Sequence, residues 1–192
     1  MPPTVKVDNQ AILQAALDVT KEKGSDALTA RNIAQKLHCS TQPIFRVYEN
    51  MAALKKDLFE YANQFFARYI MMPSDGGDPF FNIGFRYIQF AKDEANIFKM
   101  MFMSGCVESD NLIELFTSDK DNIKIMKAIP NFANCTNEQI KDLFVKIAIC
   151  THGIASLVAT NDIEFDSTAI SKLLTELFHA LVNDINSKGT QP

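Results

Sequence analysis

The chain has 192 residues, of which 47% are hydrophobic and 22% are charged, and this composition excludes an intrinsically disordered protein. No apolar run reaches the roughly 18 residues of a membrane span, and the N-terminus lacks the order of a signal peptide, so we expect a cytoplasmic protein without membrane contact. The net charge of -4 argues against a protein that coats nucleic acid through its overall field.

The charge is distributed unevenly along the chain. Residues 1–60 carry eight Lys and Arg against seven Asp and Glu, whereas the remainder carries eleven against sixteen. The excess of basic residues at the N-terminal end is mild. Any contact with DNA must therefore depend on a few placed side chains rather than on a basic surface.

The sequence offers little from which to build a catalytic or metal site. Its three histidines form no HExxH motif, and it contains no GxSxG motif and no phosphate-binding loop. The four cysteines form no CxxC pair, so we interpret them as reduced thiols in apolar segments. They are Cys39, Cys106, Cys135 and Cys150. We expect no enzyme activity, no catalytic residues, no bound metal and no cofactor.

The N-terminal part of the sequence has helical periodicity and clear end signals. Asp8 is an N-cap residue before an apolar stripe, and Gly24 ends that stripe. The hydroxyl of Thr29 can cap a second, short helix. The helices predicted here run over residues 9–23, from residue 29, over 40–48 and over 51–71.

The C-terminal part is interrupted by one strong breaker cluster, PSDGGDP at 73–79, and shows no strand pattern. Helices are predicted over residues 80–92, 94–104, 109–128, 137–160 and 167–187. Thr136 with Gln139 forms a capping-box pattern at the start of the fourth of these. The last two helices are amphipathic and suit an antiparallel hairpin that meets its symmetry mate, so we predict an all-α homodimer that associates through residues 137–187.

Residues 29–48 have the pattern of a helix-turn-helix. Ala34 is small enough for the point where two helices cross, and Ile44 and Tyr48 are spaced to anchor the second helix inward. The outward face of that helix then carries Thr41, Gln42, Phe45 and Arg46. Gln and Arg side chains make bidentate contacts with adenine and guanine edges in the major groove.

Residues 10–56 resemble the DNA-binding domain of TetR-family transcriptional repressors. TARNIAQKLHCS is similar to the family pattern T-x-R-x-I-A-x-x-L-G-V-S, and TQPIFRVY is similar to x-G-T-L-Y-x-H-F. THGIASL at 151–157 resembles the HG-containing hairpin helix of one C-terminal subfamily. The resemblance implies a helix-turn-helix domain over residues 1–50, and a larger helical domain for effector binding and dimerisation over residues 51–192.

The function implied by this resemblance is a ligand-responsive transcriptional regulator, a repressor, that binds a palindromic operator in double-stranded DNA as a homodimer. Gln42 and Arg46 are then expected to contact bases, and Thr29 with the two lysines at 55 and 56 to face phosphates. The full set of implied DNA-binding residues is Thr29, Arg31, Thr41, Gln42, Phe45, Arg46, Tyr48, Lys55 and Lys56.

Four positions depart from the family pattern. His38 replaces the glycine of the turn, and a histidine can adopt the left-handed conformation at some cost. Phe45 and Val47 replace residues that hydrogen-bond phosphates in the family, and Met51 stands where a lysine is common. These departures bear on affinity rather than on fold. The alternative interpretation is a ligand-binding or protein-interaction module of the same fold without sequence-specific DNA binding.

Residues 80–103 are rich in Phe and Met. The resemblance implies a pocket for a hydrophobic small-molecule effector in this region, and an apolar cavity lined by such side chains would bind one. The residues expected to line it are Phe85, Phe102, Phe116 and His152. The simpler interpretation is that the aromatic residues form a core and that His152 is a core or interface histidine.

Overall fold

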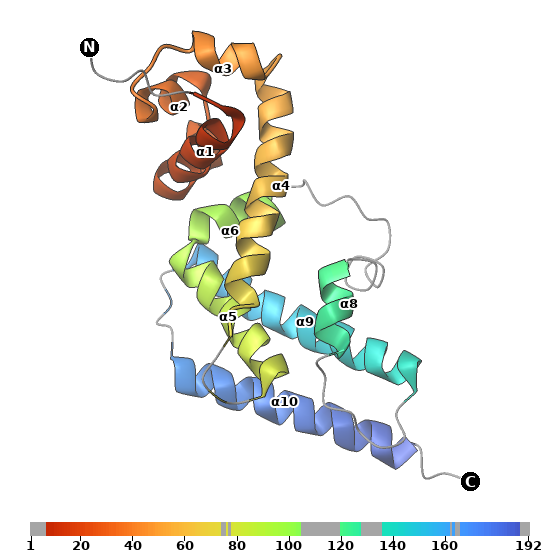
Figure 1. The fold of residues 1–192 in the computed structure, drawn as a ribbon. Helices are drawn as coiled ribbons and strands as arrows, with labels where there is room; N and C mark the ends of the chain where they lie inside the picture. Colours follow the sequence, from red (N-terminus) through yellow and green to blue (C-terminus); the bar gives the residue numbers. More distant parts are fainter. Residues whose placement is uncertain are drawn as a thin grey trace. The chain divides into compact units, whose positions relative to one another are not determined.

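The fold is all-α, as predicted. A computed structural model describes residues 7–73, 76, 78–104, 120–127, 136–161, 163 and 166–188, and every regular element within these ranges is a helix (Figure 1). The chain divides into two compact units. Unit 1 comprises residues 1–66 and 94–107, and unit 2 comprises residues 67–93 and 108–192.

Unit 1 contains the N-terminal helices and one short helix from later in the chain. Its elements are α1 (Asn9–Lys23), the 3-10 helix η1 (Ser25–Ala27), α2 (Ala30–Lys36), α3 (Gln42–Val47), the part of α4 (Met51–Ile70) up to residue 66, and α6 (Ala95–Phe102). Its innermost side chains are fully buried and almost all aliphatic or aromatic. They include Ile12, Ile33, Ile44, Leu54, Leu58, Ile97 and Phe98.

Helix α1 has the predicted bounds and the predicted caps. The Asp8 carboxylate accepts a hydrogen bond from the Ala11 amide at 2.9 Å. At the other end Gly24 has φ 80°, and its amide donates to the Thr20 carbonyl at 2.9 Å. This left-handed conformation is one that glycine adopts at little cost, which explains why the apolar stripe stops there.

Helix α6 packs against α1 although more than 70 residues separate them in sequence. Lys21 Nζ lies 2.6 Å from Glu94 Oε1, and the Asn96 side-chain amide donates to the Lys21 carbonyl at 2.8 Å. The Lys21 ammonium also lies 4.2 Å from the centroid of the Phe65 ring on α4. One lysine at the end of α1 thus connects three helices of unit 1.

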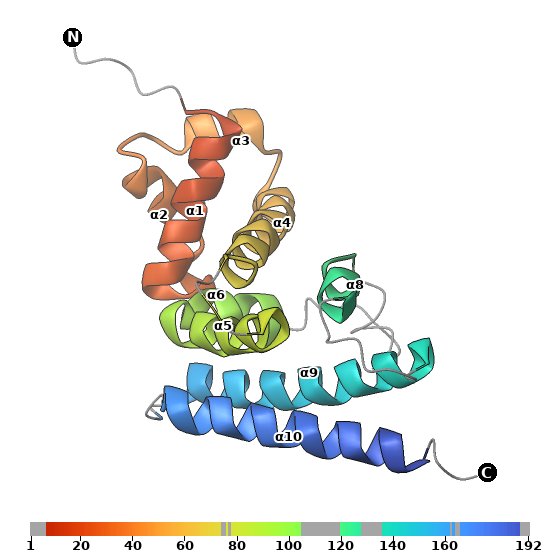
Figure 2. The ribbon, with the colours of Figure 1, turned by 60° about the horizontal axis from the view of Figure 1, so that its bottom comes forward.

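Unit 2 is built on the predicted antiparallel hairpin. Its helices are α5 (Pro79–Asp93), α8 (Lys120–Lys127), α9 (Asn137–Thr160) and α10 (Ser167–Lys188). Helices α9 and α10 lie side by side and run in opposite directions, and α5 packs against both (Figures 1 and 2). The predicted capping box is confirmed, because Thr136 Oγ1 accepts from the Gln139 amide at 3.2 Å and Gln139 Oε1 accepts from the Thr136 amide at 2.8 Å.

Two helices of unit 2, α8 and α9, bear on expectations from the sequence. Of the helix predicted over residues 109–128, the structure describes only α8, and the rest lies outside the described residues. Helix α9 is long and apolar enough to cross a membrane by length and composition alone, although 39% of its most apolar window is buried inside the structure. Core helices of soluble proteins pass the same test, and α9 buries Leu143, Phe144 and Ala155 within unit 2.

Candidate nucleic-acid interface

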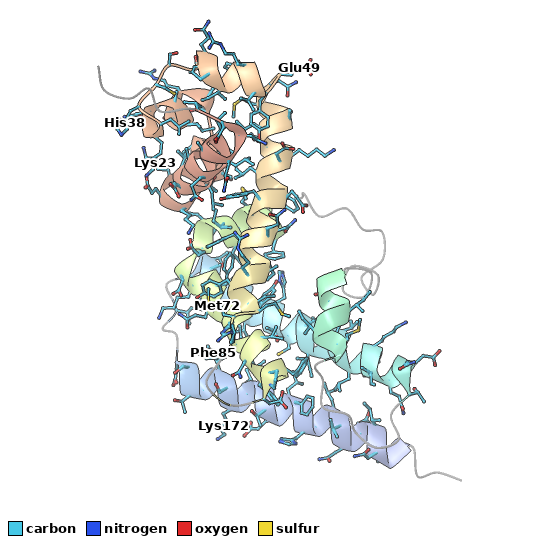
Figure 3. All side chains as sticks on the ribbon, viewed as in Figure 1. Lys23, His38, Glu49, Met72, Phe85 and Lys172 are labelled. Atoms are coloured by element: carbon cyan, nitrogen blue, oxygen red, sulfur yellow. The ribbon has the colours of Figure 1, made fainter. Side chains whose placement is uncertain are left out.

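The turn between α2 and α3 has the left-handed residue that the sequence predicts. His38 has φ 52° and is the one non-glycine residue with positive φ in the described part of the chain. The Cys39 amide donates to the Ala34 carbonyl at 3.0 Å, and the His38 amide donates to the Gln35 carbonyl at 3.2 Å. This pair of bonds is a Schellman motif, which ends α2 sharply and redirects the chain into α3. The His38 side chain is exposed (Figure 3).

Two inward side chains fix the orientation of α3. Ile44 is fully buried, and Tyr48, directly after the helix, is 5% exposed. The Tyr48 hydroxyl donates a hydrogen bond to Asn9 Oδ1 on α1. Burial, together with the nearby Asp57 carboxylate, raises the pKa of Tyr48 to about 12. Tyr48 is therefore a core residue that anchors α3, which differs from the exposed setting of the other expected DNA contacts on this helix.

The opposite side of α3 is open to solvent. Gln42 and Arg46 lie one helical turn apart and are both exposed, as are Thr41 and Phe45. Within the described residues neither Gln42 nor Arg46 makes a hydrogen bond or an ion pair with another side chain. Pro43 occupies the first turn of α3, where its missing amide proton costs no helical hydrogen bond.

Residues suited to bind phosphate occur at the starts of α2 and α4. Thr29 Oγ1 caps α2 by accepting from the Asn32 amide at 3.2 Å, and Arg31 is exposed in the first turn. Lys55 and Lys56 are exposed on α4. The start of α4 is itself capped by Asn50, whose side-chain oxygen accepts from the Ala53 amide at 2.9 Å. Sequence reasoning missed this cap, although an Asn four residues before a buried Leu is a recognisable signal.

The residues expected to line an effector pocket are distributed over both units. Phe102 belongs to unit 1, where its ring lies 4.9 Å from that of Phe98 and 5.4 Å from that of Phe66, centroid to centroid. Phe85 on α5 and His152 on α9 belong to unit 2, and both are partly buried. Phe116 lies outside the described residues.

His152 has a specific partner that sequence reasoning missed. Its Nδ1 atom lies 2.8 Å from the hydroxyl of Tyr87 on α5. Burial lowers the pKa of His152 and raises the pKa of Tyr87, so both side chains are held neutral. The tautomer of the neutral imidazole sets the direction of this bond: the phenol donates when the ring proton is on Nε2, and Nδ1 donates when it is not. The neighbouring Thr151 is buried, and its hydroxyl has no hydrogen-bond partner among the described residues.

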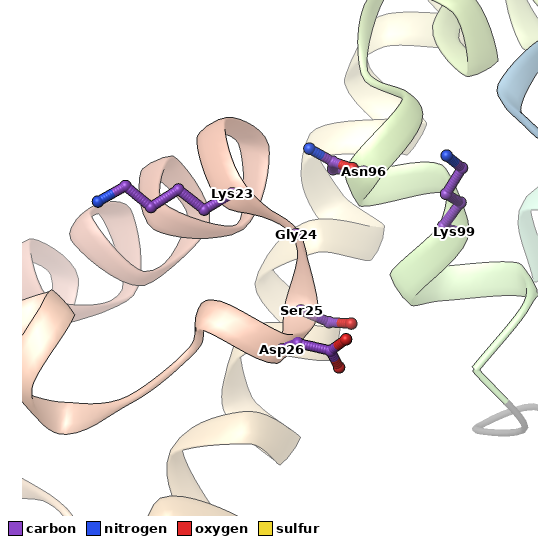
Figure 4. A pocket seen from close by; sticks show the side chains of 6 residues that line it. All are labelled: Lys23, Gly24, Ser25, Asp26, Asn96 and Lys99. Atoms are coloured by element: carbon purple, nitrogen blue, oxygen red, sulfur yellow. The ribbon is translucent and has the colours of Figure 1, made fainter.

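A small hollow of about 280 Å³ in unit 1 has none of the expected effector-binding residues in its wall. It is lined by Lys23, Gly24, Ser25, Asp26, Asn96 and Lys99. Figure 4 shows the Lys23 side chain directed away from the residues of η1. Across the described residues no group of three or more His, Cys, Asp and Glu side chains is arranged to hold a metal ion. Cys39 and Cys150 are free thiols of intermediate exposure.

Comparisons with known proteins find a solved structure of similar fold. No protein-family model and no curated protein matches the sequence. Among solved structures, the chain is similar to a TetR-like transcriptional regulator from Rhodococcus sp. RHA1, with a TM-score of 0.58 and 19% sequence identity over 93% of this chain and 96% of that one. The similarity spans both units, and the chain therefore has the fold of a TetR-like transcriptional regulator.

Proposed function

We propose that the protein is a ligand-responsive transcriptional repressor that binds operator DNA through α3. The observation that carries the proposal is the exposure of Gln42 and Arg46 on one side of a helix whose other side is anchored by Ile44 and Tyr48. An amide and a guanidinium one turn apart match the hydrogen-bonding edges of adenine and guanine. A helix with a fixed orientation can present both groups to the same groove.

Contacts with the DNA backbone are proposed for side chains that flank this helix. Thr29 with the N-terminus of α2, together with Lys55 and Lys56, would bind phosphates, and Arg31 and Thr41 would bind either phosphate or base. A chain of net charge -4 makes few such contacts, so two copies of α3 are needed for useful affinity.

The exposed face of the hairpin supports a homodimer. On α9, Ile149 is 42% exposed and Leu157 is 56% exposed, and Gly153 lies between them at a spacing of four residues. Apart from the adjoining backbone of α9 and the two neighbouring residues, no atom of the described chain lies within 4 Å of the position that a Cβ of Gly153 would occupy, so this part of α9 is open to a neighbouring helix. Leu173 on α10 is 48% exposed. Two such hairpins can bury this surface as a four-helix interface and hold two α3 helices roughly 34 to 36 Å apart, one turn of DNA.

Effector binding is proposed for the remaining region, residues 51–192, with residues 1–50 as the DNA-binding domain. A hydrophobic molecule held by aromatic side chains such as Phe85, beside the polar Tyr87–His152 pair, would favour one conformation of the dimer over another. Helix α4 contributes residues to both units, so it is suited to transmit that change. This function places the protein in the cytoplasm.

The test is a gel-shift titration with DNA from upstream of the gene, at two salt concentrations. A regulator forms a specific, salt-sensitive complex, and the Gln42→Ala and Arg46→Ala variants each lose about 1 to 3 kcal/mol of binding free energy, roughly 5- to 150-fold in affinity. Gln35→Ala is the matched control, because Gln35 is an exposed amide on α2 rather than on the outward face of α3. Equal affinity of all four proteins for any DNA would favour the module without sequence-specific binding.

A further inference from the structure

We propose that Phe45 recognises the 5-methyl group of a thymine, so that each operator half-site carries a thymine beside the bases that Gln42 and Arg46 contact. This inference rests on the proposed DNA-binding function and deepens it by assigning one base. It also gives a specific contact to a side chain that stands where the family pattern has a phosphate-binding residue.

The exposure of Phe45 is exceptional among the phenylalanines of this chain. Phe45 is 48% exposed, whereas every other Phe in the described residues is buried or of intermediate exposure. Its neighbours on the outward face of α3 are polar, so the ring is an isolated apolar group on a polar surface. Such a group gains free energy when a partner removes it from water.

The position of Phe45 on α3 makes DNA the partner that fits. Residues of a helix advance by about 100°, so Phe45 is about 60° from Gln42 and about 100° from Arg46 around the axis. All three therefore lie on the half of α3 that faces away from Ile44. Val47 is also exposed, at 43%, but it lies about 200° around the helix from Phe45. A duplex bound by Gln42 and Arg46 would cover Phe45 and leave Val47 at the margin.

The chemistry of the ring selects the methyl group of thymine among the groups of the major groove. A phenylalanine has no donor or acceptor, so it makes no hydrogen bond with a phosphate or with a base edge. The negative face of its ring is not attracted to phosphate oxygens. The 5-methyl group of thymine is the apolar group that distinguishes a base pair in this groove, and contact with Phe is one of the ways in which proteins recognise it.

The test replaces single thymines by deoxyuridine, which removes the 5-methyl group and leaves base pairing intact. Operator duplexes are first selected from a random library with the full-length protein, and each thymine of a half-site is then substituted in both copies. We expect one position at which the wild-type protein loses about fourfold in affinity per half-site, as burial of one methyl-sized group predicts. At the other thymines the substitution has little effect.

Two variants connect that position to the side chain. Phe45→Ala binds the thymine operator more weakly and no longer distinguishes it from the deoxyuridine operator. Val47→Ala removes exposed apolar surface from another side of α3, and it retains the wild-type ratio of the two affinities. Circular dichroism of Phe45→Ala is expected to match that of the wild type, because the ring lies outside the core.

The possible failures are distinguishable. If the library yields no preferred sequence, the proposed DNA-binding function fails and this inference fails with it. If a preferred sequence emerges but deoxyuridine is tolerated at every position, the protein binds a specific operator and Phe45 does not recognise a methyl group. The same conclusion holds if Phe45→Ala discriminates against deoxyuridine as strongly as the wild type does.

Discussion

The two units differ in how many of their large apolar side chains are exposed to solvent. In the described part of unit 1, only three large hydrophobic residues are exposed, and two of them belong to α3. They are Phe45, Val47 and Met103. In the described part of unit 2 the exposed set is larger and includes two residues of α9 and one of α10. That set is Met71, Met72, Ile123, Ile149, Leu157, Ile163 and Leu173. The described part of unit 1 therefore encloses most of its large apolar side chains, whereas unit 2 leaves more of them exposed to solvent.

Polar contacts between residues far apart in sequence occur in both units. Unit 1 is connected across long sequence distances by Lys21 with Glu94 at 2.6 Å, by Tyr48 with Asn9, and by the Tyr61 hydroxyl, which donates to Gln14 Oε1 at 2.8 Å. These bonds stabilise the frame that presents α3. In unit 2 the α5–α9 contact is largely apolar, with the Tyr87–His152 bond within it. Polar bonds between distant elements thus hold unit 1 in one geometry, and the exposed apolar residues of unit 2 are the basis of the proposed dimer.

The largest expected effect comes from placing a charge on the exposed face of α9. In the proposed dimer Leu157→Glu would bury an unpaired carboxylate in each copy, at a cost of about 3 to 5 kcal/mol per charge. We expect the variant to sediment as a monomer at micromolar concentration and to lose operator affinity at least 100-fold. Analytical ultracentrifugation and gel shift measure the two effects. The helix content stays unchanged, because Leu157 is 56% exposed in a single copy.

Lys141→Glu is the control for this variant. Lys141 is an exposed residue of α9 that lies about 160° around the helix from Leu157 and two turns before Ile149, so the added negative charge lies outside the surface of Ile149, Gly153 and Leu157. It should remain a dimer. If Leu157→Glu also remains a dimer, copies of the chain associate through another surface, and the contrast between the two units needs a different explanation.

A smaller effect is expected from truncating the anchor of α3. Ile44 is fully buried, so Ile44→Ala removes packed carbon atoms and leaves a cavity, at a cost of about 2 to 5 kcal/mol in the free energy of unfolding. Chemical denaturation followed by circular dichroism measures it. Val47→Ala on the same helix should change stability by less than about 0.5 kcal/mol, because Val47 is 43% exposed. Dimerisation should survive in both variants. Equal stability of the two would contradict the closed core of unit 1.

Local signals made much of the fold predictable. The start of α1 at Asp8, its end at Gly24 and the capping box at Thr136 each depend on residues within a few positions of one another, and all three are confirmed. The contacts between helices were not predictable in this way. The pairing of Lys21 with Glu94 joins residues 73 positions apart, and no local pattern in the sequence predicts it.

In the candidate site, too, features that depend on nearby residues were predictable, and contacts between different helices were not. Helical spacing predicted that Gln42 and Arg46 share an outward face, and both are exposed. Tyr48 has the spacing of an anchor and the chemistry of a phosphate contact, and its burial shows that it anchors α3. In unit 2 the partner of His152 is on another helix, so composition alone indicated an aromatic region without identifying Tyr87.

The smallest expected effect is the pH dependence of stability that arises from the Tyr87–His152 pair. Burial lowers the pKa of His152 from its ordinary value near 6.5, so the folded protein binds this proton more weakly than the unfolded chain does. The stabilisation from neutral His152 is therefore fully present above about pH 6.5 and is lost as the pH falls through the lower, folded-state value. His152→Asn keeps a side-chain oxygen near the position of Nδ1 but does not titrate. Urea denaturation at pH 8.0 and pH 5.5 should show a larger decrease in unfolding free energy for the wild type than for His152→Asn. Because His152 is only partly buried, the difference between the two decreases should be smaller than the destabilisation by Ile44→Ala. Equal decreases for the wild type and His152→Asn would mean that His152 is not held neutral.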